Sequence, residues 1–288
     1  MALAAPSTYD RSVMKQVEEL LSSARAHSAR GDDHGRAGDV PQALSEWTLA
    51  LEEARQVLLQ DPTSREARHL EVKLRCACGG ARLQLGDAAR AAQDLRGLPV
   101  DSLTGPVLLN RGIAFYFTGD FDGAIADLHS IIQATPEHRT ARSLRGRSLV
   151  HKQSYEQAIV DLGVALAASP DSEDFAWRGL ALQRVGRHRE AVADFDEAIR
   201  LDSQQAAALG NRARSRLELG ETQGAVADLD ASLRIQPDAP EVLLERGNAR
   251  RLLGDVAGAR ADIERAMGLA PGDWECRPVA QRLLASLA

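Results

Sequence analysis

Residue types that can transfer protons stand together in the stretch RGLALQRVGRHREAVAD, which runs from Arg178 to Asp194. Arginine, histidine, glutamate and aspartate within one short segment could form a small acid–base site. However, the Arg–Asp separation of this stretch recurs four more times along the chain, in the pairs Arg111 with Asp127, Arg145 with Asp161, Arg212 with Asp228 and Arg246 with Asp262. Five identical pairs indicate a repeated structural contact rather than five active sites. An arginine packed between helices needs a carboxylate because an unpaired buried charge is costly.

The spacing allows two pairing schemes. Each arginine could bind the aspartate of its own repeat, or it could bind the aspartate of the preceding repeat, as in Asp94 with Arg111 and Asp127 with Arg145. The second scheme is supported by Cys78, which stands where the arginine that belongs with Asp94 would be. Sequence spacing does not choose between the schemes.

The other chemically capable residues form no catalytic or metal-binding motif. His188 and Glu190 flank a predicted turn, where solvated polar residues are expected. The remaining histidines are scattered without the spacing H-E-x-x-H, and there is no Cys/His cluster, phosphate-binding loop or G-x-S-x-G motif. The sequence therefore predicts a protein that is not an enzyme and has no cofactor and no metal.

The composition argues against several classes of partner. The chain has 288 residues and a net charge of −6, which disfavours general binding to nucleic acid. Three cysteines do not make a disulfide framework, and neither a signal peptide nor a membrane-length apolar run is present. We expect a cytoplasmic protein that binds neither nucleic acid nor membrane, and the sequence does not determine whether it self-associates.

A repeat of 33 or 34 residues organises most of the chain. Small residues recur at Ala124, Ala158, Ala191, Ala225 and Ala259, each preceded by a turn with Gly119, Gln153, Gly186, Gly220 or Gly254. Four residues after each alanine stands a bulky apolar residue, and a proline or serine ends the unit. Glycine turns the chain and proline cannot continue a helix, so each unit is predicted to be a pair of antiparallel helices.

These positions resemble the tetratricopeptide repeat (TPR), which has a period of about 34 residues. The resemblance implies an all-α fold, a right-handed α-solenoid of about seven helix pairs with helical caps. The predicted organisation is an N-terminal tail and flanking helix at 1–23, an atypical first repeat with extended helices at 24–71, further repeats at 72–104, 105–138, 139–171, 172–205, 206–239 and 240–273, and a C-terminal capping helix at 274–288.

In this family the first helices of successive repeats line a concave groove, so the resemblance implies a surface that binds a protein or peptide segment. The predicted groove has an apolar step followed by a basic stripe, which would suit a partner with an apolar anchor and an acidic flank. Its residues are Leu109, Ile113, Tyr116, Phe117, Arg147, His151, Arg184 and Arg214.

The predicted function is a non-catalytic interaction scaffold, or adaptor. The family's carboxylate clamp, in which lysine and asparagines hold a chaperone's C-terminus, is absent: Cys76 and Gly80 stand beside Asn110, and Glu241 and Glu245 beside Asn211. Two alternatives stay open. One is a co-chaperone-type subunit without the clamp, and the other is the recruiting fragment of a larger protein.

Overall fold

A computed structural model of the chain describes residues 8–99 and 103–287. Residues 1–7 of the predicted tail and 100–102 of the second predicted repeat lie outside the described residues. The described residues form helices with connecting segments and no strand, and they make up two compact units, one ending at Pro136 and one beginning at Glu137. None of the helices described is long and apolar enough to cross a membrane.

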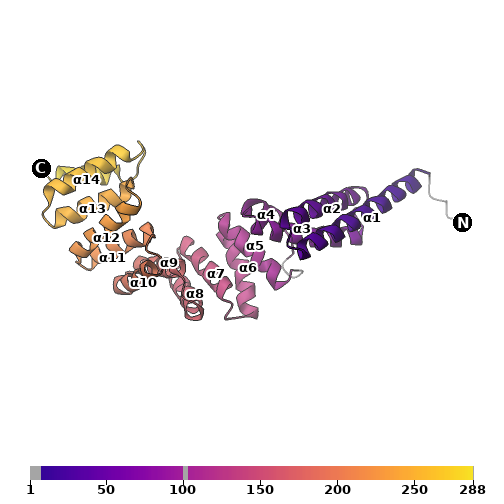
Figure 1. The fold of residues 1–288 in the computed structure, drawn as a ribbon, viewed down its shortest axis with the longest axis horizontal. Coiled ribbons are helices and arrows are strands. Elements are labelled where there is room, and N and C mark those ends of the chain that lie inside the picture. Colours follow the sequence, from indigo (N-terminus) through magenta and orange to yellow (C-terminus); the bar gives the residue numbers. More distant parts are fainter. Residues whose placement is uncertain (1–7, 100–102, 288) are drawn as a thin grey trace. The chain divides into compact units, whose positions relative to one another are not determined.

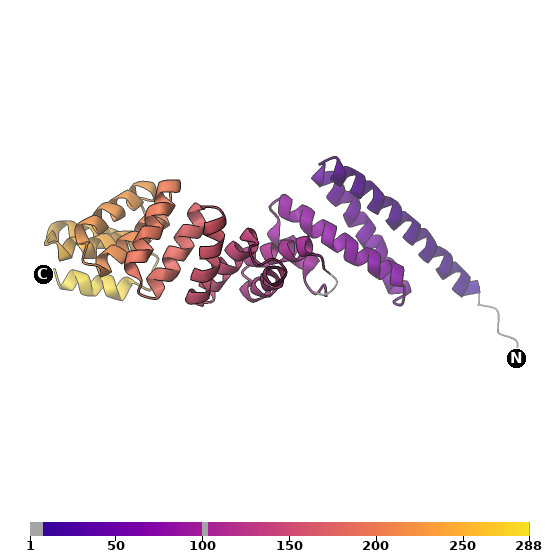
Figure 2. The ribbon, with the colours of Figure 1, turned by 90° about the horizontal axis from the view of Figure 1, so that it is seen from below.

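The described part of the first unit contains six helices (Figure 1). They are α1 (Thr8–Arg36), α2 (Val40–Gln60), α3 (Arg65–Gln84), α4 (Ala88–Leu95), α5 (Gly105–Phe117) and α6 (Phe121–Ala134). Figure 2 shows the long helices α1, α2 and α3 side by side. The predicted boundaries at 23/24 and 71/72 fall inside α1 and α3, so the division of this segment into a tail and one repeat stays a prediction.

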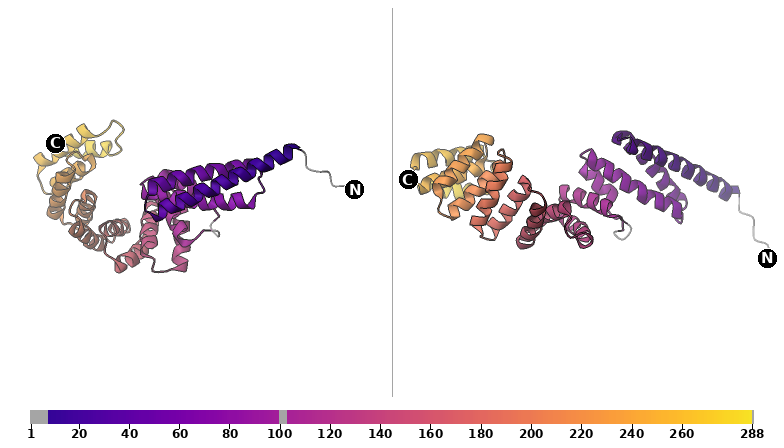
Figure 3. Two further views of the ribbon diagram at one scale, coloured as in Figure 1. Left: turned by 45° about the vertical axis from the view of Figure 1, so that its right-hand side comes forward. Right: turned by 60° about the horizontal axis from the view of Figure 1, so that its bottom comes forward.

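The second unit continues the same pattern of helix pairs (Figure 3). Its helices are α7 (Arg139–His151), α8 (Tyr155–Ala168), α9 (Ser172–Arg184), α10 (His188–Leu201), α11 (Ala206–Glu218), α12 (Thr222–Ile235), α13 (Pro240–Leu252), α14 (Val256–Leu269) and α15 (Arg277–Ala285). Each helix from α8 to α14 packs against the next one along the chain.

The turn inside each pair needs a left-handed backbone residue. Gly119 has a φ of 79° between α5 and α6, and glycine adopts this conformation without a steric penalty. Gln153 takes the same place between α7 and α8 with a φ of 60°, and within the described residues it is the only non-glycine residue with positive φ.

Close approach of the two helices of a pair builds the core. Ala124, Ala158, Ala191, Ala225 and Ala259 are all completely buried, as are the bulky residues four positions later. Each bulky residue faces a small one on the preceding helix. A Cβ on Gly179 would lie 2.8 Å from Phe195, and one on Gly146 would lie 2.7 Å from Leu162. Glycine is therefore required where these side chains contact the opposite helix.

The arginine–aspartate pairs form within each repeat. Arg111 donates from Nε and Nη2 to the two carboxylate oxygens of Asp127, both at 2.7 Å. The same bidentate geometry occurs in the other four pairs, Arg145–Asp161, Arg178–Asp194, Arg212–Asp228 and Arg246–Asp262. This geometry matches the planar guanidinium to the carboxylate. The paired aspartates are all buried, so each one is neutralised where water cannot solvate it.

In the second predicted repeat, an arginine at a different position neutralises the buried aspartate. Asp94 is bound by Arg82, which stands four residues after Cys78, one helical turn along α3. In the last two pairs an arginine at this later position joins the first one, since Arg216 binds Asp228 and Arg250 binds Asp262. The pairing of Asp94 with Arg111 is therefore wrong.

A further set of ion pairs connects neighbouring repeats of the second unit. Arg212 of α11 donates to Asp196 of α10 at 2.6 Å, and Arg246 of α13 donates to Asp230 of α12 at 2.7 Å. Arg178 of α9 has no such partner because Gly163 of α8 occupies the corresponding place. The sequence analysis did not predict these ion pairs between repeats.

The last helix covers the apolar end of the second unit. Leu283 and Leu284 of α15 pack against a cluster that includes Leu243, Ile263 and Trp274. The indole nitrogen of Trp274 donates to Glu241 of α13 at 2.9 Å. A solenoid needs such a cover because its last helix pair would otherwise expose an apolar face.

Candidate functional site

Helix α5 carries the aromatic and aliphatic cluster that the sequence predicted as the apolar step. Leu109, Ile113 and Tyr116 are half-buried, whereas Phe117 is 67% exposed. The ring of Tyr116 packs edge-on against Phe117 at 5.3 Å and against Phe121 of α6 at 6.1 Å. Ile113 and Phe117 line the same cavity, so the structure brings these two of the four residues to one recess.

That recess lies between α3 and α5 and has a volume of about 710 Å³. Helix α3 contributes Leu83 and Gln84, and α5 contributes Asn110 together with Ile113 and Phe117. None of the residues lining it carries an ionisable side chain. Its walls are apolar, and two carboxamides supply hydrogen-bonding groups, which is the usual make-up of a ligand pocket.

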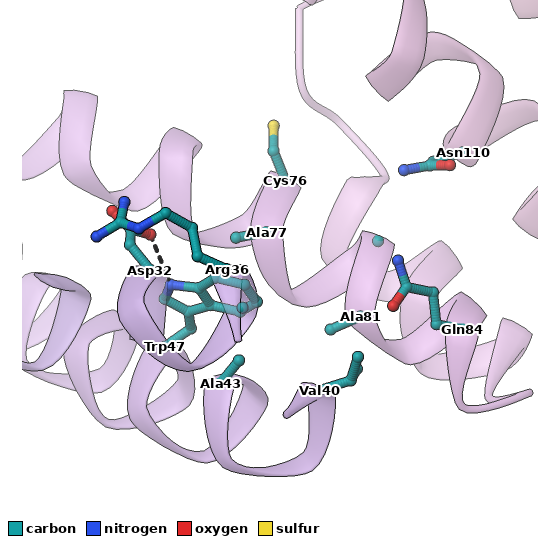
Figure 4. Close-up of a pocket in the computed structure, with 12 residues that line it drawn as sticks. Asp32, Arg36, Val40, Ala43, Trp47, Cys76, Ala77, Ala81, Gln84 and Asn110 are labelled. Carbon is teal, nitrogen blue, oxygen red and sulfur yellow. Dashed lines mark hydrogen bonds between the residues drawn. The ribbon is translucent and has the colours of Figure 1, made fainter. Parts of the chain in front are cut away.

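A second cavity of about 500 Å³ lies among α1, α2, α3 and α5 (Figure 4). Trp47 forms one side of it, and the indole nitrogen donates to Asp32 at 3.0 Å. A Cβ on Gly35 of α1 would lie only 3.1 Å from the Trp47 ring, so the indole is closely packed. Tight packing and a hydrogen bond together hold this aromatic wall in one orientation.

The two cavities adjoin and share Gly80, Gln84 and Asn110. We call the combined recess the first-unit groove. Figure 4 shows Asn110 of α5 projecting toward Ala77 and Gln84 of α3, across the open space. Cys76 also lines the groove, and partial burial raises the pKa of its thiol.

In the second unit, Arg147 binds carboxylates of this chain. Its guanidinium donates to Asp174 at 2.8 Å and to Asp171 at 3.1 Å, and it also pairs with Glu173. Asp174 is completely buried and accepts a further hydrogen bond from Ser143 at 2.6 Å. Arg147 therefore compensates a buried charge in its own unit, a role that the sequence analysis missed.

The other predicted residues of the second unit differ in their surroundings. His151 packs against the Trp177 ring at 5.0 Å, and burial lowers the pKa of its imidazole, which favours the neutral form. Arg214 pairs with Glu245 of α13. Arg184 is exposed and has no ion-pair partner among the described residues. None of these residues lines either cavity of the first-unit groove.

Sequence reasoning missed Trp47, Gln84 and Gly80 as groove residues. Gly80 could have been identified from the repeat, because the same place in later repeats is occupied by side chains such as Ile113. The position of Trp47 could not be found in this way, since α1 and α2 lie outside the regular 34-residue spacing. No group of three His, Cys, Asp or Glu side chains able to hold a metal ion occurs in the described part of the chain.

Stacked helix pairs with a recess along their first helices define a helical-repeat protein of the solenoid class. The sequence profile of the tetratricopeptide repeat matches residues 109–173, 178–240 and 211–273, which together make up more than half of the chain. The chain belongs to the tetratricopeptide repeat family.

Two curated proteins share part of this sequence. Superkiller complex protein 3 of Mus musculus is 26% identical over 114 residues, which cover 39% of this chain and 7% of that protein. The DnaJ homolog subfamily C member 7 homolog of Schizosaccharomyces pombe is 26% identical over 125 residues, which cover 38% of this chain and 26% of that protein. The matches thus span about a quarter or less of these relatives.

Several solved structures share the fold. YrrB, described as a TPR protein with an unusual peptide-binding site, has a TM-score of 0.55 at 16% identity and covers 62% of this chain and 91% of its own. MamA has a TM-score of 0.53 at 20% identity, covering 57% and 91%. A tetratricopeptide repeat protein from Parabacteroides merdae has a TM-score of 0.52 at 18% identity and covers 95% and 99%.

Proposed function

We propose that this chain is a non-catalytic scaffold that binds a peptide segment of a partner protein in the first-unit groove. The sharing of Gly80, Gln84 and Asn110 by the two adjoining cavities is the observation that carries the proposal. A continuous recess of this kind can hold several consecutive residues of an extended segment. The likeness to YrrB, whose description includes a peptide-binding site, supports the same class of function.

The second unit is a weaker candidate for the peptide site. Its charged inner residues bind each other, as in the pairs of Arg147 with Asp171 and Arg214 with Glu245. A peptide that displaced these contacts would have to replace them, which reduces the net gain from binding. The apolar anchor of the predicted partner would contact Ile113 and Phe117 of the first unit, and the acidic flank stays a prediction. The cytoplasmic location stays a prediction.

The proposal is tested with peptides selected from a displayed library of random 12-residue segments against the full chain. Phe117→Ala should weaken binding of the selected peptides by at least about tenfold, because a large exposed anchor is removed. The protein should stay folded, since Phe117 is 67% exposed. Affinity is measured by fluorescence anisotropy and folding by circular dichroism.

The matched control is Leu252→Ala, which removes a 54% exposed residue at the equivalent position of α13. This variant should bind the peptides as the unaltered chain does. A failure to select any peptide, or equal loss of affinity in both variants, would contradict binding in the first-unit groove.

A second candidate function is a co-chaperone-type subunit, which the similarity to a protein named as a DnaJ homologue favours. Because the carboxylate clamp is absent, this role would require recognition that does not depend on a free C-terminus. Binding of an intact heat-shock chaperone that persists after amidation of the chaperone's C-terminal carboxylate would favour this candidate over the first.

A further inference from the structure

Gly80 of α3 stands at a position where the first helices of the later repeats, from α5 to α13, carry large side chains. The residues at 33- or 34-residue intervals from it are Ile113, Arg147, Leu180, Arg214 and Asn248. Its neighbour one turn earlier, Ala77, is also small, whereas later repeats carry Asn110, Leu144, Trp177, Asn211 and Glu245 there. Small residues therefore make the surface of α3 shallow between the bulkier α1–α2 pair and α5.

The two cavities meet at Gly80, which has no side chain. Gly80 lines both of them, and a Cβ built on it would meet one atom within 4 Å, the amide nitrogen of Asn110 at 3.2 Å. A larger side chain at this position would extend into the space where the cavities meet. The size of residue 80 thus controls whether one segment can occupy both.

The chemistry of the groove excludes a charged anchor. No ionisable side chain lines the α3–α5 cavity, so a charge buried there would lose its hydration without gaining a partner. The carboxamides of Gln84 and Asn110 have no hydrogen-bond partner among the described residues, and each can both donate to and accept from a peptide main chain.

The charges at the other end of the groove are already compensated. Asp32 accepts hydrogen bonds from the Lys73 ammonium at 2.7 Å and from Trp47 at 3.0 Å. Arg36 pairs with Asp33 on its own helix. A ligand therefore meets no unpaired charge of either sign along the cavity lining.

We propose that Gly80 determines the specificity of the first-unit groove. It admits an uncharged peptide segment that places one large aromatic or aliphatic side chain between α3 and α5 and its main chain against Asn110 and Gln84. The inference rests on the proposed function, because it names the kind of segment that the same groove accepts.

The test uses the selected 12-residue peptides, synthesised with acetylated and amidated ends. The enriched sequences should share one large aromatic or aliphatic residue and few charges around it. Replacing that residue of the peptide by glutamate should abolish binding, and replacing it by alanine should weaken binding at least about tenfold. Gly80→Leu should weaken binding of the parent peptide by a similar factor, and Gly80→Ala should have a smaller effect.

Gly210→Leu and Gly210→Ala are matched controls on the first helix of another repeat, α11, where an added Cβ meets nothing within 4 Å. They should leave affinity unchanged. If Gly80→Leu does not fold, the affinity of Gly80→Ala provides the test. This variant should fold, because its single Cβ contacts only the movable end of the Asn110 side chain.

The outcomes separate the two proposals. Peptides that bind tightly but are enriched in charges, or that bind both Gly80 variants with unchanged affinity, would overturn the specificity inference and leave peptide binding intact. Absence of any peptide bound to the unaltered chain would overturn both.

Discussion

Two cysteines that are neighbours in sequence have different environments on α3. Cys78 is completely buried in a cluster with Ala50, Leu51 and Leu74. Burial, together with the nearby Asp94 carboxylate, raises the pKa of its thiol to about 11. Cys76 lies at the groove and is half-buried, so burial raises the pKa of its thiol without enclosing it.

We expect these cysteines to react at different rates because the thiolate is the reactive form. At pH 8 a maleimide should modify Cys76 and the half-buried Cys276 in the folded chain, and Cys78 roughly 100-fold more slowly than an ordinary thiol. Peptide mass spectrometry after timed labelling measures this. In denaturant all three should react alike; rapid labelling of Cys78 in the folded chain would show that its burial is wrong.

The limits of sequence reasoning at this scale are shown by Arg147. The sequence placed it correctly on a first helix, but its partners are Asp171, which caps α9, and Asp174 on α9, and their separations of 24 and 27 residues do not follow the repeat period. Whether an inward arginine is available to a ligand depends on such contacts. Ile113 and Phe117 could be predicted as groove residues because an apolar side chain forms no ion pair. Its accessibility therefore follows from its position on the helix alone.

At the scale of the elements, most of what could be predicted came from the small residues that pack against bulky ones between the two helices of a pair. The alanines at 33- or 34-residue intervals predicted a helix pair for each period, and all five are completely buried where the helices pack. The α1–α2 pair was harder to place, because α1 has 29 residues and α2 has 21, and their long contact does not follow the period.

The connection between α8 and α9 lacks an ion pair that later repeats possess. Nη1 of Arg178 would lie 3.7 Å from a Cβ at Gly163, where α10 and α12 carry Asp196 and Asp230. Gly163→Asp should raise the free energy of unfolding by about 0.5–1 kcal/mol more than Gly163→Asn, because only aspartate supplies the charge. Urea denaturation measures both variants.

Salt provides the control for that comparison. The difference between the aspartate and asparagine variants should shrink in 1 M salt, which screens a partly exposed pair. Equal stability of the two variants at low salt would mean that Arg178 does not reach residue 163.

At the scale of the whole molecule, each helix contacts mainly its neighbours along the chain. Stability in such an array is a sum of local terms, so damage at one place should remain local. Trp274 offers a test because it is almost completely buried in the cluster beneath α15.

Trp274→Ala should lower local stability by about 3–5 kcal/mol, since it leaves a large cavity. Hydrogen exchange followed by mass spectrometry should show lost protection in α13 to α15 and unchanged protection in α1 to α3. Trp177→Ala, a half-buried change in α9, serves as the comparison and should affect α7 to α9 instead. Uniform loss of protection after either change would show that the chain unfolds as one cooperative body.

Much of the buried complementarity of the second unit lies inside single helix pairs. Gly179 fits Phe195, and Arg178 binds Asp194, both between α9 and α10. Some bonds between pairs, such as that of Arg212 with Asp196, involve a half-exposed carboxylate, but the bond of Arg147 on α7 with Asp174 of α9 involves a buried one. A duplication or deletion that begins and ends between pairs would keep the matched contacts inside each pair, whereas a break within a pair would separate two surfaces shaped for each other. Such an array can change length in evolution by whole hairpins when only the contacts between neighbouring pairs are adjusted.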